Sequence, residues 1–163
     1  QRAHDEKLWN EAVWNQAVWN QAVWDNAVNE HLWYKEAARR AEARRLSGRP
    51  GAVSAALSMQ GTPYLWAGDS PSTGFDCSGL VTWAYAQVGR PGLPHSSRAL
   101  VSMGRRISVG ELQPGDLVAY GSPVHHIGIY IGGGQYVHAP RTGDVVKVSS
   151  IYRFNGTPIA VRI

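Results

Sequence analysis

Gly74-Phe75-Asp76-Cys77-Ser78-Gly79-Leu80 contains the only cysteine among the 163 residues of the chain. The preceding residues, 68–74, are rich in Gly, Ser and Pro, which predicts a loop. The following residues, 80–88, carry apolar side chains at helical spacing, which predicts a helix. We therefore expect Cys77 in the first turn of a helix, where unpaired backbone N–H groups and the helix dipole favour thiolate over thiol.

A lone cysteine can serve as a small packing residue or as a nucleophile. Asp76 and Ser78 beside Cys77, and the histidines further along the chain, favour the nucleophile. A thiolate nucleophile needs a base, and that base can come from a distant part of the sequence.

The histidines that could supply this base lie in two predicted strands. His125 and His126 open one strand and His138 lies near the end of the next. If these strands form a hairpin around residues 132–134, positions 126 and 138 become cross-strand neighbours. His125 and His126 face opposite sides of their strand, so only one of them can join Cys77. A cysteine, a histidine and a third polar group that orients the imidazole form an arrangement suited to acyl transfer.

Three histidines and a cysteine could instead bind zinc. However, the sequence has no close-spaced ligand pair such as H-x-x-x-H or C-x-x-C, and adjacent His125 and His126 cannot both chelate from one strand. We therefore predict no metal and no cofactor.

Residues 8–28 contain a five-residue repeat with tryptophan at positions 9, 14, 19 and 24. On a helix this period rotates each tryptophan by about 140° from the one before, so apolar side chains appear on all sides. Ala, Gln and Glu favour helix, and neither Gly nor Pro occurs before Gly48, which predicts a helical extension over residues 1–46. A helix that is apolar all round requires a partner. We expect residues 8–28 to self-associate or bind a protein partner, rather than to cover the active site.

Residues 47–51 form a predicted linker, and residues 52–163 have the pattern of an α+β domain. Short helices at 52–59, after Cys77 and at 96–103 precede five short runs rich in β-formers, separated by Gly-rich turns. This spacing indicates an antiparallel sheet. The predicted strands are Leu117–Tyr120, Ile127–Ile131, Tyr136–Ala139, Val145–Val148 and Ile159–Ile163.

Composition limits the class of protein. No run approaches the roughly 18 uninterrupted apolar residues of a membrane span, so we predict no such span. One cysteine cannot form an internal disulfide, which leaves the redox compartment open. Residues 47–163 carry nine basic and five acidic side chains, which suits a polyanionic partner such as cell-wall polymer or nucleic acid. The chain begins at Gln1 without a signal-peptide pattern, so we expect a processed or trimmed chain.

Five motifs together resemble the NlpC/P60 family over about residues 52–163. They are Gly61-Thr62-Pro63-Tyr64-Leu65-Trp66-Ala67-Gly68, Asp76-Cys77-Ser78-Gly79-Leu80, Gln113-Pro114-Gly115-Asp116-Leu117-Val118, His126-Ile127-Gly128-Ile129-Tyr130 and Tyr136-Val137-His138-Ala139-Pro140. The resemblance implies a papain-like α+β core and a bacterial, secreted or cell-wall-associated cysteine peptidase. Its expected partner is the peptidoglycan stem peptide, typically cut at the γ-D-glutamyl–diaminopimelate bond, and not nucleic acid.

The resemblance also implies roles for single residues. It assigns Cys77 as nucleophile, His126 as base and His138 as third member of the triad. Substrate contacts are implied for Tyr64 at the rim of the site, for Asp76 and Ser78, and for Ser96 and Ser97. His95 departs from the pattern, because the family commonly carries Arg there, so substrate anchoring near Ser96 and Ser97 is open.

Other uses of the same domain stay open from the sequence. The triad could transfer an acyl group to an amine instead of water. It could also act as an amidase on the N-acetylmuramoyl–L-alanine bond, or cut a peptide outside the wall. An inactive wall-binding module is a further alternative, disfavoured by the presence of Cys77, His126 and His138.

Overall fold

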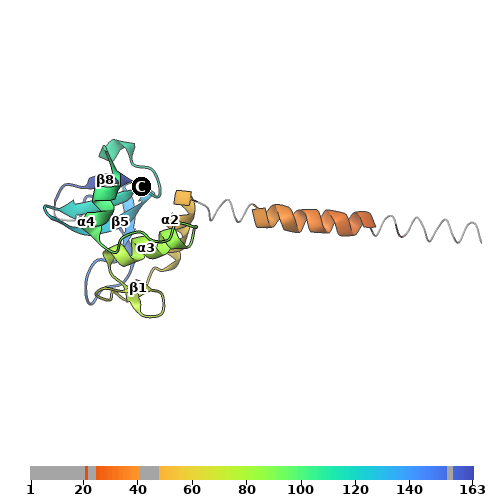
Figure 1. Ribbon diagram of the computed structural model, residues 1–163, viewed down its shortest axis with the longest axis horizontal. Coiled ribbons are helices and arrows are strands. Elements are labelled where there is room, and N and C mark those ends of the chain that lie inside the picture. The colour runs from red at the N-terminus through yellow and green to blue at the C-terminus, as the bar shows by residue number, and fades with distance from the viewer. Residues whose placement is uncertain (1–20, 22–24, 41–47, 154–155) are drawn as a thin grey trace, which may run out of the picture. The chain divides into compact units, whose positions relative to one another are not determined.

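The computed structural model describes residues 21, 25–40, 48–153 and 156–163. The chain divides into two units, Gln1–Glu42 and Ala43–Ile163. In the first unit residues 25–40 are helical, as predicted (Figure 1). Glu36 supports this helix through exposed ion pairs of 2.9 Å with Arg39 and 3.0 Å with Arg40. The tryptophan repeat at positions 9–24 lies outside the described residues.

The second unit begins with helix α2 (Gly48–Ser58). We predicted this helix from residue 52, with residues 48–51 as linker, so its start differs from the prediction. Pro50 is tolerated because it lies in the first turn, where backbone N–H groups have no helical partner. Arg49 holds the turn in place, since its guanidinium forms a 2.8 Å ion pair with the buried carboxylate of Asp116.

Two further helices begin with a side-chain cap. Asp76 is the N-cap of α3 (Cys77–Ala86), with extended backbone and a carboxylate that accepts the Gly79 N–H at 2.7 Å. Ser96 caps α4 (Ser97–Met103) by accepting the Ala99 N–H at 3.3 Å. Such caps are worth about 1 kcal/mol each. Cys77 is therefore the first residue of its helix, as predicted.

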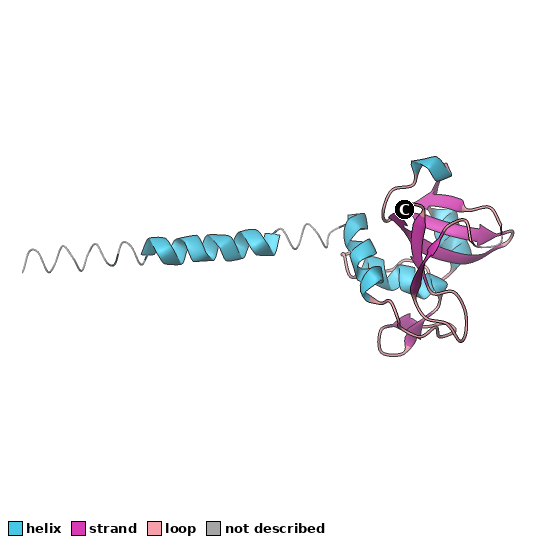
Figure 2. Cartoon of the chain, turned by 180° about the vertical axis from the view of Figure 1, so that it is seen from behind, coloured by secondary structure: helices cyan, strands magenta, loops and turns pink. Residues whose placement is uncertain are grey.

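Six strands form one antiparallel sheet in the order β3-β8-β4-β5-β6-β7, and Figure 2 shows how strongly the sheet is twisted. This is the α+β fold expected from the sequence. A two-stranded ribbon and a short 3-10 helix, neither of them predicted, complete the unit. The elements are β1 (Asp69–Ser70), β2 (Gly74–Phe75), β3 (Arg105–Ile107), η1 (Val109–Glu111), β4 (Leu117–Gly121), β5 (Val124–Gly132), β6 (Gln135–His138), β7 (Lys147–Ser150) and β8 (Ile159–Arg162).

The main core lies between the helices and one face of the sheet. Fully buried Leu80 and Val81 of α3 belong to the same cluster as Ile127 and Ile129 of β5 and Val137 of β6. Each such side chain contributes about 1.5–3 kcal/mol on burial, so packing on β5 fixes α3 and the cysteine at its start. A smaller cluster forms around Val118, Tyr120, Tyr136 and Ile151. No helix among the described residues is long and apolar enough to cross a membrane.

Asp116 links distant parts of this unit. Its side chain is fully buried and forms ion pairs with Arg49 of α2 and Arg162 of β8, at 2.8 and 2.7 Å. It also accepts the backbone N–H of Gln113 at 2.8 Å. Burial opposes ionisation, but the hydrogen bonds from Arg162, Gln113 and Arg49 hold the pKa of Asp116 below its ordinary value. The carboxylate therefore stays charged and connects helix α2 to strand β8.

Candidate active site

A groove of about 570 Å³ opens at the start of α3, and we call it the Cys77 groove. It brings together the loop before Cys77, the start of α4 and the start of β5. All five residues predicted to contact substrate lie on its wall together with the cysteine. The lining residues are Tyr64, Trp66, Ala67, Asp76, Cys77, Ser78, His95, Ser96, Ser97, Arg98, Val124 and His125.

The Cys77 thiol is more strongly protonated than its helix position alone predicts. Burial and the neighbouring Asp76 carboxylate raise the pKa of the thiol, and backbone hydrogen bonds with Ile127, Ser78 and Cys77 itself offset only part of this rise. Partial desolvation therefore outweighs the helix N-terminus, which corrects the expectation of a stable thiolate. The Cys77 side chain therefore rests as a thiol.

Asp76 joins the helix cap to the groove. Its Oδ1 lies 2.7 Å from Nε2 of His95 and 3.4 Å from the Ser78 hydroxyl, in addition to accepting the Gly79 N–H. His95, the residue that departs from the family pattern, is therefore a direct partner of Asp76. The sequence did not predict this pairing, because helix α3 and the irregular loop after it lie between the two residues.

His126 and His138 form a buried hydrogen-bonded pair. Nε2 of His126 lies 2.8 Å from Nδ1 of His138, and each residue is 3% exposed. The two rings meet nearly edge to face, with centroids 5.0 Å apart. Tyr136 stacks on the His138 ring at a centroid distance of 4.2 Å. The predicted association of the two histidines across the hairpin is thus present.

The register of this hairpin differs from the prediction. Positions 126 and 138 were expected to face each other, but Ile129 pairs with Val137, and a bulge follows between Tyr130 and Gly132. Continuing this register places Gly128 opposite His138, with His126 on the diagonal. A Cβ at Gly128 would lie 2.9 Å from the His138 Cβ and 2.7 Å from the Val137 carbonyl oxygen. The closest atom to that Cβ would be Cδ2 of Tyr136, at 2.5 Å. The missing side chain therefore leaves room for the Tyr136 ring, which stacks on His138.

The histidine pair and the Cys77 groove meet along β5. Neither His126 nor His138 is among the described residues that line the groove. The Cys77 thiol has a backbone hydrogen bond with Ile127, the residue after His126. His125, the residue before it, lines the groove. Ile127 thus contacts the Cys77 thiol and His125 lines the groove. His126 lies between them in the strand, buried where His125 is exposed, consistent with their opposite orientations.

Both buried imidazoles favour the neutral form. Burial, with smaller contributions from His138 and His125, lowers the pKa of His126 from 6.5 to about 3. The pKa of His138 is lowered to about 4, mainly by burial and also by Lys147, while Asp144 partly opposes the shift. A neutral imidazole has one ring nitrogen without a proton, so each of the two rings can accept one.

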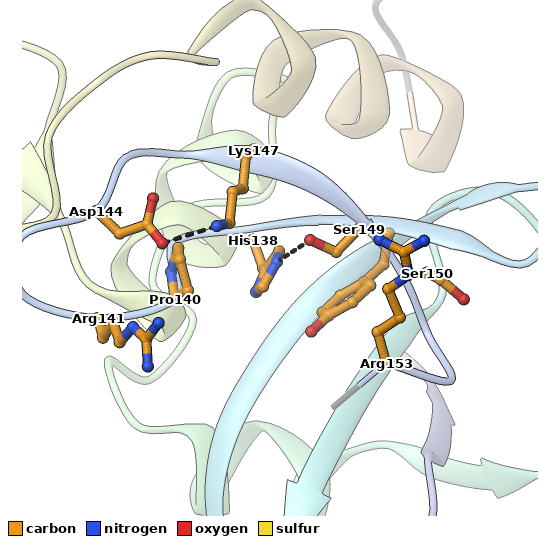
Figure 3. A pocket seen from close by; sticks show the side chains of 9 residues that line it. His138, Pro140, Arg141, Asp144, Lys147, Ser149, Ser150 and Arg153 are labelled. Atoms are coloured by element: carbon orange, nitrogen blue, oxygen red, sulfur yellow. Dashed lines mark hydrogen bonds and ion pairs between the residues drawn. The ribbon is translucent and has the colours of Figure 1, made fainter. Parts of the chain in front are cut away.

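His138 has a second polar partner that the sequence analysis missed. Its Nε2 lies 2.9 Å from Oγ of Ser149 on β7. Ser149 borders a second pocket of about 470 Å³, the Ser149 pocket, drawn in Figure 3. The pairing of β6 with β7 brings Ser149 beside His138. The predicted strand Val145–Val148 ends one residue before Ser149, so the sequence carried no signal of this contact. Among the described residues no group of three or more His, Cys, Asp or Glu side chains could hold a metal ion.

The sequence pattern of the NlpC/P60 family matches residues 61–158. Among curated proteins, a probable endopeptidase of Mycobacterium tuberculosis is 49% identical to the chain over 100 residues, which are 61% of this chain and 26% of that protein. The chain thus spans about a quarter of the length of this relative.

Two solved structures resemble the second unit. The NlpC/P60 domain of the peptidoglycan hydrolase SagA has a TM-score of 0.65 and 42% identity, covering 71% of this chain and 99% of that one. RipD of Mycobacterium tuberculosis, described as a non-catalytic NlpC/P60 domain protein adapted to peptidoglycan binding, has a TM-score of 0.60 and 36% identity. That likeness covers 69% of this chain and 94% of RipD.

Proposed function

The chain belongs to the NlpC/P60 family, and on this premise we propose that it is a cysteine peptidase that hydrolyses peptidoglycan stem peptides. The observation that carries the proposal is a half-buried cysteine at a helix start, bordered by strand β5, whose buried His126 is hydrogen-bonded to His138 of β6. A thiol that can be deprotonated only when a substrate arrives is suited to acyl transfer in a site that excludes water.

The triad that we propose consists of Cys77, His126 and His138. Cys77 attacks the amide carbonyl while His126 takes the thiol proton, which gives a tetrahedral intermediate and then a thioester. The backbone N–H of Cys77, at the start of α3, helps to hold the oxyanion. His126 donates the proton to the leaving amine, and water then hydrolyses the thioester with His126 again as base. His138 orients the His126 ring.

The hydrogen bond between the two histidines indicates which nitrogen of the His126 ring exchanges a proton with Cys77. Since Nε2 of His126 is bonded to Nδ1 of His138, we assign proton exchange with Cys77 to Nδ1 of His126. The lowered pKa of His126 and the raised pKa of Cys77 favour a neutral resting pair. Proton transfer then accompanies attack instead of preceding it as a stable ion pair.

The Cys77 groove supports a substrate with charges of both signs. Among the lining residues, Asp76 supplies a carboxylate that can accept hydrogen bonds from an amine, and Arg98 supplies a cation. Tyr64, Ser78, Ser96 and Ser97 add hydroxyl groups. Stem peptides that contain diaminopimelate carry both free carboxylates and a free amine, and we assign the γ-D-glutamyl–diaminopimelate bond as the scissile amide.

The test is incubation of the purified full chain with diaminopimelate-containing muropeptides, followed by the masses of the products. Cleavage at the γ-D-glutamyl bond gives a dipeptide-bearing sugar and a diaminopimelate peptide. An amidase would release the complete stem, and an acyltransferase would add the mass of an amine acceptor. Absence of all products would instead favour the wall-binding role described for RipD, which pull-down on insoluble peptidoglycan would measure.

The N-terminal tryptophan repeat is assigned to self-association or to binding of a protein partner, with the Cys77 groove left open. The variant in which Trp9, Trp14, Trp19 and Trp24 are all replaced by Ala tests this assignment in the full chain. We expect a lower solution mass or loss of partner binding with unchanged turnover. A large rise in turnover at unchanged mass would show that the segment inhibits the site instead.

The proposed site of action is the bacterial cell wall, outside the cytoplasm.

A further inference from the structure

The hydrogen bonds that begin at His126 do not end at His138. Nδ1 of His138 bonds to His126 at 2.8 Å and Nε2 bonds to Oγ of Ser149 at 2.9 Å. Both ring nitrogens of His138 therefore have a specific partner. Figure 3 shows the His138 ring directed at the Ser149 hydroxyl across the two paired strands.

The direction of this chain of bonds decides which nitrogen of His126 carries a proton. For His126 to accept a proton at Nδ1, its neutral ring must hold its own proton at Nε2 and donate it to Nδ1 of His138. His138 must then hold its proton at Nε2 and donate it to an acceptor. With the opposite direction, His138 would donate from Nδ1, and Nδ1 of the neutral His126 ring would carry a proton and be unable to act as base.

We propose that Ser149 is a positioning residue that accepts the Nε2–H of His138, holds that ring in the Nε2–H tautomer and so keeps Nδ1 of His126 ready to receive the Cys77 proton. This inference rests on the proposed peptidase function. Ser149 does not touch the reacting atoms and acts through two histidines.

Among the described residues, the side chain that lies within hydrogen-bond distance of Nε2 of His138 is that of Ser149. The titratable or charged side chains near the ring are Tyr136, which stacks on it from β6, His126 on β5, Lys147 on β7 and Asp144 in the preceding loop. Lys147 can only donate, and its ammonium forms a 2.7 Å ion pair with Asp144. The Asp144 carboxylate also accepts the Val145 N–H at 2.8 Å.

The Ser149 pocket limits the size of the expected effect. This pocket, with His138 and Ser149 on its wall, offers space in which a water molecule can replace a lost hydroxyl. A neutral hydrogen bond is worth about 0.5–1.5 kcal/mol. We therefore expect Ser149→Ala to lower kcat about three- to tenfold, with KM unchanged because the residue lies outside the Cys77 groove.

The experiment compares three variants of the full chain by muropeptide kinetics and by ¹⁵N NMR of the histidine side chains. In the wild type we expect protonated Nε2 and unprotonated Nδ1 on His138. Ser149→Ala is expected to give a mixture of tautomers and the lower kcat, and Ser149→Thr, which keeps the hydroxyl, to restore both. Ser150→Ala is the matched control, because the neighbouring hydroxyl bonds the Tyr152 backbone N–H instead, and it is expected to change neither.

Two results would overturn the inference: a wild-type His138 protonated at Nδ1, or a Ser149→Ala variant with wild-type kcat and a single Nε2–H tautomer. The tautomer of His138 is measured without substrate. Failure of the proposed peptidase function can therefore be distinguished from failure of the inference about Ser149. A wild-type chain with the expected tautomer but no action on muropeptides would contradict the peptidase assignment and leave the role of Ser149 in ordering His138 intact.

Discussion

His126 and His138 are joined by a 2.8 Å hydrogen bond although they do not face each other in the hairpin. The residue opposite His138 is Gly128, and the two rings meet diagonally across the position where a side chain is missing. Diagonal positions on neighbouring strands are about 7–8 Å apart, a gap that two imidazole rings can bridge. The pair therefore depends on a glycine that takes no part in the chemistry.

The first prediction concerns this glycine. In Gly128→Ala the new methyl group would approach Tyr136 Cδ2 to 2.5 Å, Val137 O to 2.7 Å and His138 Cβ to 2.9 Å, so β6 and the Tyr136 ring that stacks on His138 must shift. We expect a loss of about 1–3 kcal/mol in the free energy of unfolding and at least a tenfold fall in kcat, about 1.4 kcal/mol. Urea unfolding and muropeptide kinetics measure these. Gly110→Ala is the control, since no atom lies within 4 Å of its added Cβ; equal behaviour of the two variants would contradict the account.

His138 is predicted to orient His126 without being indispensable. In His138→Asn the amide oxygen can stand near the position of Nδ1 and accept from His126, and His138→Gln retains a polar acceptor, so both are expected to keep measurable activity. His138→Ala has no acceptor and is expected to lose more. The comparison is made by initial rates on one muropeptide. Equal rates in all three variants would remove His138 from the triad.

The buried histidine pair predicts a pH-dependent stability. The folded-state pKa values of His126 and His138, about 3 and about 4, lie below their ordinary 6.5. The unfolded chain therefore binds more protons as the pH falls below 6.5, and the folded state loses stability there. Between about pH 8 and about pH 5 one such histidine costs on the order of 2 kcal/mol. Urea midpoints at the two pH values measure the loss.

The control for this prediction is the double variant His126→Gln/His138→Gln, in which the pH dependence between about pH 5 and about pH 6.5 is expected to shrink. Asp116, whose pKa lies below its ordinary 3.8, titrates under more acidic conditions and does not contribute in this window. A wild type with equal unfolding midpoints at both pH values would show that the two imidazoles are not kept neutral by burial.

Removal of the buried Asp116 carboxylate is predicted to lower the free energy of unfolding. Asp116→Ala would leave Arg49 and Arg162, whose side chains are only 33% and 22% exposed, without their shared anion. We expect a loss of about 2–4 kcal/mol in the free energy of unfolding, measured by urea. Asp69→Asn is the control, because that exposed carboxylate forms no ion pair among the described residues. A loss under about 0.5 kcal/mol for Asp116→Ala would show that the network contributes little.

The sequence predicted what depends on nearby residues. The loop-forming residues before Cys77 and the apolar spacing after it lie within a few positions, so Cys77 could be placed in the first turn of α3. The start of α4 was placed to within one residue in the same way. The register of the β5–β6 hairpin was wrong by two residues, because the bulge after Tyr130 depends on how the strands pack. The start of α2 was missed because its anchor, the Arg49–Asp116 ion pair, spans 67 positions.

The site shows the same division between local and long-range causes. Cys77, His126 and His138 could be selected from residue type and order. The raised pKa of Cys77 could not, because it results from burial that only the folded chain produces. Ser149 was missed because its partner His138 lies 11 residues away on the neighbouring strand, and a serine in a polar, alternating run gives no local signal of such a contact.

The most direct measurement of the central claim is the rate of muropeptide hydrolysis by Cys77→Ala and His126→Ala beside the wild type. We expect each variant to lose at least about a thousandfold in turnover while circular dichroism reports an unchanged fold. His31→Ala, a histidine in the helix of the first unit, is the matched control and is expected to retain the wild-type rate. Wild-type turnover by folded Cys77→Ala would contradict the assignment of Cys77 as the nucleophile.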